Sequence, residues 1–324
     1  MSDIKKSILN YINNKKTAKV KDLVDNFNVS KQAVHKHLNE LIELGMIEKV
    51  GSAPKVFYIP RKIEKAPILS DISGEKKKIL SENYMIITPE GRRLEGIDGF
   101  EYWCSRHDLP LEKTVDDYIS TFQKYDKYKI DGLIDATPKI SESFEKIGLD
   151  KMYYKDFYSI ERFGKTKLGQ ILLYAKQGQD KNLIKQISDV IRDSVLGIMN
   201  RENIDAVGFI PPTVKREVQL MKELRKMMSL SIPEINLIKV RGDVSVPQKT
   251  LNRIEDRIEN ARKSIFIDSD KEYNNVLLID DAVGSGATLN ETALQIKERG
   301  MCKGKIIGFA ITGSFKGFDV ISEV

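Results

Sequence analysis

The segment from residue 276 to residue 288 constrains the fold most strongly, because it joins an apolar run, two acidic residues and a glycine loop. Residues 276–279 are branched and apolar, which is typical of a strand buried on both faces of a parallel sheet. Asp280 and Asp281 follow at the expected strand end, where open α/β sheets bind ligands. Residues 284–288 form a small-residue loop before an amphipathic segment, and such a loop can surround a phosphate with backbone N–H groups. An ordinary Asp-Gly turn after a core strand is the alternative.

The size and composition indicate a globular protein without a membrane span. A chain of 324 residues is long enough for two or three domains, and 41% hydrophobic residues with mixed charge fit a folded core. We find no run of eighteen apolar residues and no signal-peptide core at the start of the sequence. Cys104 and Cys302 lie far apart without metal-binding spacing, which predicts a reducing, cytoplasmic location.

The positive charge is concentrated near the N-terminus. Residues 1–65 contain 13 of the 53 lysines and arginines but only 7 of the 47 aspartates and glutamates, so the whole net charge of +6 lies there. This asymmetry predicts a module at residues 1–65 that faces nucleic acid, attached to an electrically neutral body.

The N-terminal pattern predicts three helices and a hairpin. Apolar residues recur at helical spacing over residues 3–13, and a second short helix is expected over residues 17–27. Ser30 is a candidate N-cap for a third helix that ends near Leu44. Residues 46–50 and 55–59 flank a Gly-Ser-Ala-Pro turn, which predicts a strand–turn–strand hairpin. This order of elements predicts a winged helix-turn-helix domain.

Residues 21–59 resemble bacterial winged-helix regulators, especially in the run from Ser30 to Val50. The resemblance implies that the third helix enters the DNA major groove and that the wing touches the backbone. A winged helix used for dimerisation or for protein contact is the alternative. The side chains that we expect to contact DNA are polar or basic and belong to the third helix or the wing: Ser30, Lys31, Gln32, His35, Lys36 and Lys55.

Residues 66–150 are predicted to be a linker and a mainly helical middle region. Prolines and a run of lysines mark residues 61–78 as a linker with at most a short helix start. A strand is expected over residues 84–88, and helices with aromatic core residues are expected over residues 100–104 and 115–128.

Residues 151–324 alternate strand and helix patterns. Strands are expected at residues 204–210, 236–240, 276–279 and 305–312, with helices over residues 181–199 and 218–228. This alternation predicts an α/β domain with a mostly parallel sheet and flanking helices.

Residues 276–288 also resemble the phosphoribosyl pyrophosphate (PRPP) motif of the type I phosphoribosyltransferases. From Tyr154 onward the chain is similar to the ComF-like branch of that family, through four elements in the expected order. They are Phe163-Gly164 with Ala175-Lys176-Gln-Gly178, Ile210-Pro211-Pro212 with Lys215-Arg216-Glu-Val-Gln219, Gln248-Lys-Thr-Leu251 with Arg257-Ile-Glu-Asn260, and the motif itself.

The resemblance implies a site for PRPP or a nucleotide 5-phosphate together with Mg²⁺. Asp280 and Asp281 would hold the ribose hydroxyls and influence the metal ion, and Lys215 and Arg216 would neutralise the pyrophosphate. In the alternative, Asp280 only caps the loop, and the two basic residues are solvated. The phosphate loop implied by the motif consists of Val283, Gly284, Ser285, Gly286, Ala287 and Thr288.

Three functions remain open from the sequence. The first is a DNA-binding regulator, for which a homodimer is possible, whose phosphoribosyltransferase-like domain senses PRPP or a nucleotide. The second is an active phosphoribosyltransferase or nucleotide-processing enzyme. The third is the effector of a retron-type anti-phage defence system, with a reverse transcriptase and its RNA–DNA hybrid as partners. No residue pattern identifies an acceptor substrate.

Overall fold

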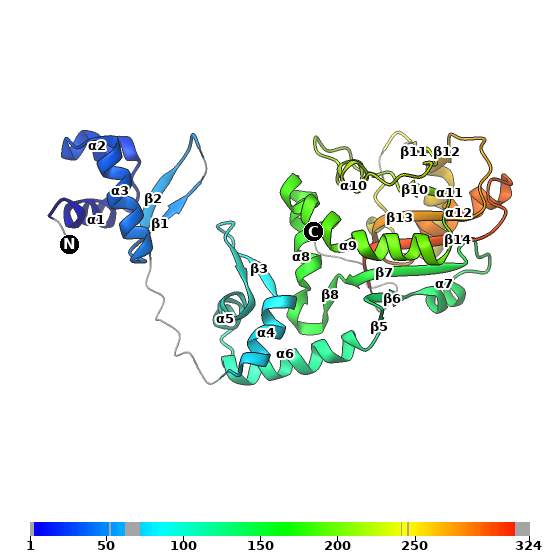
Figure 1. The fold of residues 1–324 in the computed structure, drawn as a ribbon, viewed down its shortest axis with the longest axis horizontal. Coiled ribbons are helices and arrows are strands. Elements are labelled where there is room, and N and C mark those ends of the chain that lie inside the picture. Colours follow the sequence, from blue (N-terminus) through cyan, green and yellow to red (C-terminus); the bar gives the residue numbers. More distant parts are fainter. Residues whose placement is uncertain (1–2, 52, 62–71, 241, 245, 315–324) are drawn as a thin grey trace. The chain divides into compact units, whose positions relative to one another are not determined.

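The computed structural model describes residues 3–51, 53–61, 72–240, 242–244 and 246–314. The chain divides into two compact units, residues 1–70 and residues 71–324 (Figure 1).

The N-terminal unit has the elements of a winged helix. They are α1 (Asp3–Lys15), α2 (Val20–Phe27), α3 (Lys31–Glu43), β1 (Ile47–Val50) and β2 (Phe57–Pro60). The two strands pair antiparallel, with Ile47 opposite Pro60, so the predicted order of three helices and a hairpin is confirmed. The second helix begins three residues later than expected because Ala18 forms a β-bridge with Tyr58, which holds the chain extended before α2.

This unit has its own hydrophobic core, and α3 contributes a large part of it. The Ser30 side chain accepts a hydrogen bond from the Ala33 N–H at 3.2 Å and caps the helix as predicted. Val34, Leu38 and Leu41 are fully buried along one face of α3. They pack against apolar residues of the other elements, namely Ile8, Ile12, Ala18, Leu23, Ile47 and Tyr58.

The second unit is built on a six-stranded sheet with the order β10-β13-β14-β7-β6-β5. The strands are β5 (Lys129–Ile130), β6 (Leu133–Asp135), β7 (Lys151–Phe157), β10 (Ala206–Phe209), β13 (Val276–Val283) and β14 (Ile306–Gly313). Strands β10, β13, β14 and β7 run parallel, whereas β6 and β5 extend the sheet antiparallel. The predicted mixed α/β architecture with a mostly parallel sheet is therefore present.

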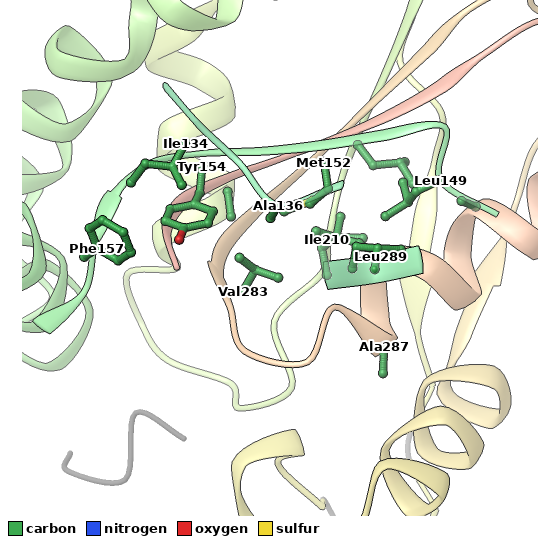
Figure 2. Packing of buried hydrophobic residues seen from close by; sticks show 14 of the residues in the cluster. Ile134, Ala136, Leu149, Met152, Tyr154, Phe157, Ile210, Val283, Ala287 and Leu289 are labelled. Carbon is green, nitrogen blue, oxygen red and sulfur yellow. The ribbon is translucent and has the colours of Figure 1, made fainter. Parts of the chain in front are cut away.

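Helices cover both faces of this sheet. The helices of this unit are α4 (Gly74–Asn83), α5 (Gly96–Arg106), α6 (Leu111–Asp126), α7 (Thr137–Ser143), α8 (Lys167–Gln177), α9 (Lys181–Arg201), α10 (Leu220–Met228), α11 (Ile254–Ser264) and α12 (Ala287–Glu298). On one face, α8, α9 and α10 pack against Leu277 and Ile279. On the other face, α7 and α12 pack against Val276 and Leu278. Figure 2 shows part of this second core, around Met152, Tyr154 and Val283.

The strand that we expected at residues 236–240 does not belong to the main sheet. Instead, β11 (Leu237–Lys239) pairs antiparallel with β12 (Ile265–Ile267) in a separate two-stranded sheet. The preceding chain does follow β10 briefly, since the Ile235 N–H donates to the Val207 carbonyl at 2.8 Å. It then turns away, and Ile238 is 41% exposed. One buried and one solvated face is the pattern of a strand outside a double-sided core.

The middle of the chain is more structured than the sequence indicated. Residues 62–71 of the predicted linker lie outside the described part. Its end contains a helix start, which the prediction allowed: Ser73 caps α4 by accepting the Lys76 N–H, and the helix continues to Asn83. Strands β3 (Met85–Ile87) and β4 (Arg93–Glu95) form a hairpin, and α5 and α6 correspond to the two expected helices. The short strands β8 (Ser159–Ile160) and β9 (Gly164–Lys165) precede α8.

The loop before α12 depends on a glycine. Gly286 has φ = +83°, and a Cβ atom at this position would overlap Cδ1 of the buried Ile140. Both the positive φ and the close approach of Ile140 require a residue without a side chain.

We therefore predict that Gly286→Ala is more destabilising than Gly91→Ala. Gly91 has φ = +81°, but a Cβ atom there would have no neighbour within 4 Å, so the control measures the backbone strain alone. The additional loss at Gly286 should be about 1 kcal/mol, because the methyl group overpacks the core. Denaturant unfolding measures the difference. In an Ile140→Val background, which removes Cδ1, this difference should disappear; equal losses in the original background contradict the prediction.

Candidate functional site

The ends of the central parallel strands and the segments around them enclose a cavity of about 300 Å³. Residues 280–289 form one wall, from the end of β13 into α12. The segment that follows β10, including Pro211 and Pro212, also lines the cavity, and α8 contributes Lys176 and Gln177. Such a cavity at the carboxyl ends of parallel strands is the usual ligand site of an open α/β sheet.

Both residues of the acidic pair, Asp280 and Asp281, line this cavity. Strand β13 continues through Val283, so both residues belong to the strand rather than to a loop after it. The Asp280 carboxylate accepts a hydrogen bond from the Asp281 N–H at 2.7 Å. The Asp281 Oδ2 atom lies 2.6 Å from Lys176 Nζ, in an ion pair with α8.

The electrostatics of the pair depend on its burial and on two lysines. Burial and the adjacent charge of Asp281 raise the pKa of Asp280 to about 7. Burial disfavours the charged form of Lys176, but the charge of Asp281, its hydrogen bond and the charge of Asp280 together raise the pKa of Lys176. Burial lowers the pKa of Lys239, which also lines the cavity, and the charge of Asp280 opposes this shift.

All six residues of the predicted phosphate loop, Val283 to Thr288, line the cavity. The buried Ser285 accepts the Ala287 N–H at 3.4 Å, and Gly286 precedes the first turn of α12. Asn290 anchors this turn, because its side chain accepts from the Gly148 N–H and donates to the Lys146 carbonyl, both at 2.9 Å. The loop therefore presents a helix N-terminus to the cavity, where its dipole favours an anion.

Of the two basic residues assigned to pyrophosphate, only Arg216 lines the cavity. Its guanidinium donates to the Gln177 side chain at 3.3 Å. Lys215 is exposed and does not reach the cavity wall. The structure therefore brings only one residue of the expected pair to the cavity.

Two lysines and an arginine of the cavity were absent from the predicted site. The sequence indicates Lys176 and Arg257 only as parts of family elements, and Lys239 carries no sequence signal beyond its place at a strand end. The Arg257 Nε atom donates to the Leu251 carbonyl at 2.8 Å, and the Gln248 side chain donates to the Arg257 carbonyl. Gln248 and Arg257, which lie between β11 and β12, therefore belong to the cavity wall as well.

The donor set for a metal ion is small. Within the described residues, no three His, Cys, Asp or Glu side chains gather in a way that could hold a metal ion. The cavity offers Asp280 and Asp281, and Lys176 already engages one of them. Mg²⁺ prefers octahedral oxygen coordination and usually takes several ligands from a substrate phosphate and water. These residues therefore fit a Mg²⁺ ion only if a bound phosphate ligand supplies further oxygens.

The N-terminal unit presents the predicted DNA-contacting residues at its surface. Lys31, Gln32 and Lys36 are exposed on α3, and His35 is half-buried. Lys55 is exposed in the turn between β1 and β2. Ser30 is exposed while its side chain caps α3. The buried stripe and these side chains occupy different faces of the helix, so the polar face is available for an external partner.

Among the helices that the structure describes, none has both the length and the apolar character that crossing a bilayer requires.

Comparisons with known proteins identify one domain. Residues 1–55 match the sequence profile of the MarR family. No curated protein matches the chain. A crystal structure of a hypoxanthine phosphoribosyltransferase from Staphylococcus aureus matches with 13% identity and a TM-score of 0.25, over 41% of this chain and 66% of that chain; this likeness is too low to carry an argument. The comparisons thus place a MarR-type winged helix at the N-terminus and establish no family for the remaining residues.

Proposed function

We propose that this protein is a ligand-responsive DNA-binding regulator, whose α/β unit binds PRPP or another ribose 5-phosphate compound. The observation that carries the proposal is the cavity in which the acidic pair and the helix-terminal loop line one wall. The MarR-type domain in the same chain supports the role of DNA as the second ligand. A homodimer would present two recognition helices, which is how many helix-turn-helix proteins read two half-sites.

The two parts of the cavity suit the two ends of a ribose 5-phosphate group. Backbone N–H groups of residues 284–288 and the positive end of the α12 dipole would hold the phosphate. Carboxylates accept hydrogen bonds from hydroxyl groups, so Asp280 and Asp281 would orient the ribose diol. Arg216 would neutralise a pyrophosphate at the anomeric carbon. Asp280 and Asp281 would hold Mg²⁺ together with oxygens of that pyrophosphate, and the ion would neutralise part of the pyrophosphate charge.

An active phosphoribosyltransferase is the second candidate, and the cavity favours it only in part. Transfer would break the bond from the anomeric carbon to pyrophosphate and form a bond to an acceptor, with pyrophosphate leaving. Stabilisation of the charge on the departing pyrophosphate would be the main catalytic contribution. Arg216, which lines the cavity, would provide this stabilisation, whereas Lys215 does not reach the cavity. The ComF-like relationship stays a prediction. No contact in the described structure and no comparison favours the retron-effector hypothesis or a complex with an RNA–DNA hybrid.

For DNA binding, we predict that Lys31→Glu with Lys36→Glu weakens binding to duplex DNA at least tenfold. Both side chains are exposed on α3, and loss of two phosphate contacts should reduce the slope of log K against log salt by about 2. Fluorescence anisotropy over a salt series measures both quantities. Lys15→Glu with Lys16→Glu is the matched control, because it changes the net charge equally at the C-terminal end of α1. Equal losses in the two variants would remove α3 from the interface.

For the cavity, we predict that PRPP with Mg²⁺ binds the wild-type protein and that Asp280→Asn with Asp281→Asn weakens this binding at least tenfold. The reason is the loss of two charged hydrogen-bond acceptors for the ribose hydroxyls, each a contact of about 1.5–3 kcal/mol. Isothermal titration calorimetry measures the two affinities. Asp189→Asn with Asp193→Asn, on the exposed side of α9, should bind like the wild type. A wild-type protein that does not bind PRPP would refute the ligand assignment.

For regulation, we predict that PRPP changes the affinity for DNA by about 5- to 150-fold, the range of a typical coupling free energy. A ligand shifts an equilibrium only through its different affinities for the two states, so DNA must change the affinity for PRPP by the same factor. Each dissociation constant is measured with and without the other ligand at fixed salt. Constants that do not change would show that the two units are merely tethered, and would favour the enzyme.

A further inference from the structure

Lys176 makes the closest charged contact that the structure gives the acidic pair. It is the penultimate residue of α8, and its Nζ atom lies 2.6 Å from Asp281 Oδ2. The side chains are 38% and 17% exposed, so the pair is partly shielded from water at the cavity wall. Ala175 and Leu172 bury the same helix against the sheet and thereby fix the position from which Lys176 reaches Asp281.

The cavity wall carries more basic than acidic side chains. Asp280 and Asp281 bring two acidic groups, whereas Lys176, Lys239, Arg216 and Arg257 bring four basic groups. A divalent cation on the carboxylates would therefore meet lysine charges rather than an uncompensated negative site. At the short separations inside a partly buried cavity, such repulsion is less screened than in water.

We propose that Lys176 is a fixed counter-ion that takes the place of a divalent cation beside Asp281, so that the cavity binds a ribose 5-phosphate group without a metal ion. This inference rests on the proposed ligand class. The ion pair uses one oxygen of the Asp281 carboxylate, and a carboxylate has further acceptor sites for a ribose hydroxyl. Mg²⁺ then accompanies only those ligands that carry a pyrophosphate of their own.

The test compares ribose 5-phosphate and PRPP as calorimetric probes, each in EDTA and in Mg²⁺, with the full-length protein. Wild type should bind ribose 5-phosphate equally well in both buffers, whereas PRPP should bind more tightly with Mg²⁺. Lys176→Met should bind ribose 5-phosphate at least about tenfold more weakly in EDTA, because the charge of Asp281 is then uncompensated and repels the phosphate dianion in the same cavity. Mg²⁺ should restore part of this affinity, since Asp281 is then free to bind the ion. Lys176→Arg should behave like wild type.

Lys167→Met is the matched control, because Lys167 lies on the same helix and is also ion-paired, with Glu95 at 2.7 Å, but does not line the cavity. It should leave the Mg²⁺ dependence of both probes unchanged. Thermal unfolding of every variant confirms that the fold is intact. Two results overturn the inference while the proposed function stands: wild type that binds ribose 5-phosphate only with Mg²⁺, or a Lys176→Met variant with no new Mg²⁺ dependence. Failure of both probes to bind wild type under any condition refutes the proposed function and the inference together.

Discussion

Burial of β13 on both of its faces is the constraint on which the α/β unit depends. Val276 to Ile279 have no solvent exposure, and alternate side chains enter the cores on the two sides of the sheet. A strand of this kind must lie in the middle of a sheet that helices cover on both faces. The next two residues are aspartates, so the burial of the strand is what delivers a pair of carboxylates to the edge where ligands bind.

Two acidic groups at such a position need compensation, because an unpaired buried charge is costly. The chain supplies it from segments that are distant in sequence: Lys176 from α8 and Lys239 from β11. The loop side instead presents the N-terminus of α12 to the cavity. The cavity thus combines an acidic pair, whose charge the lysines compensate, with a loop that attracts anions. A sugar phosphate requires both, because its hydroxyl groups donate to carboxylates and its phosphate is an anion.

The winged helix folds around a hydrophobic core of its own. Among the described residues, its core draws on all three helices and both strands, from Ile8 to Tyr58. Because α3 buries Val34, Leu38 and Leu41 on one side only, its other side is free to be polar. The excess positive charge of residues 1–65 therefore does not have to be buried in the core, and it remains available to bind a polyanion.

Local patterns were sufficient for much of this structure. Helical spacing and the Ser30 cap predicted the N-terminal helices, and the apolar run with its aspartates and glycines predicted β13, the acidic pair and the loop before α12. In each case, the physical cause lies within a few consecutive residues, as a periodicity, a cap or a conformation that only glycine adopts.

The tertiary structure decided what depends on pairing between distant segments. The sequence does not distinguish β11 from a strand of the main sheet, because a short apolar run fits either, and only the turn away from β10 assigns it to the pair with β12. Nor does the sequence show that Arg216 reaches the cavity while Lys215 does not. The ion pair of Lys176 and Asp281 joins residues 105 positions apart. The sequence alone thus determined which elements and which acidic residues the site would contain, whereas the packing of α8 against the sheet determined which cation faces them.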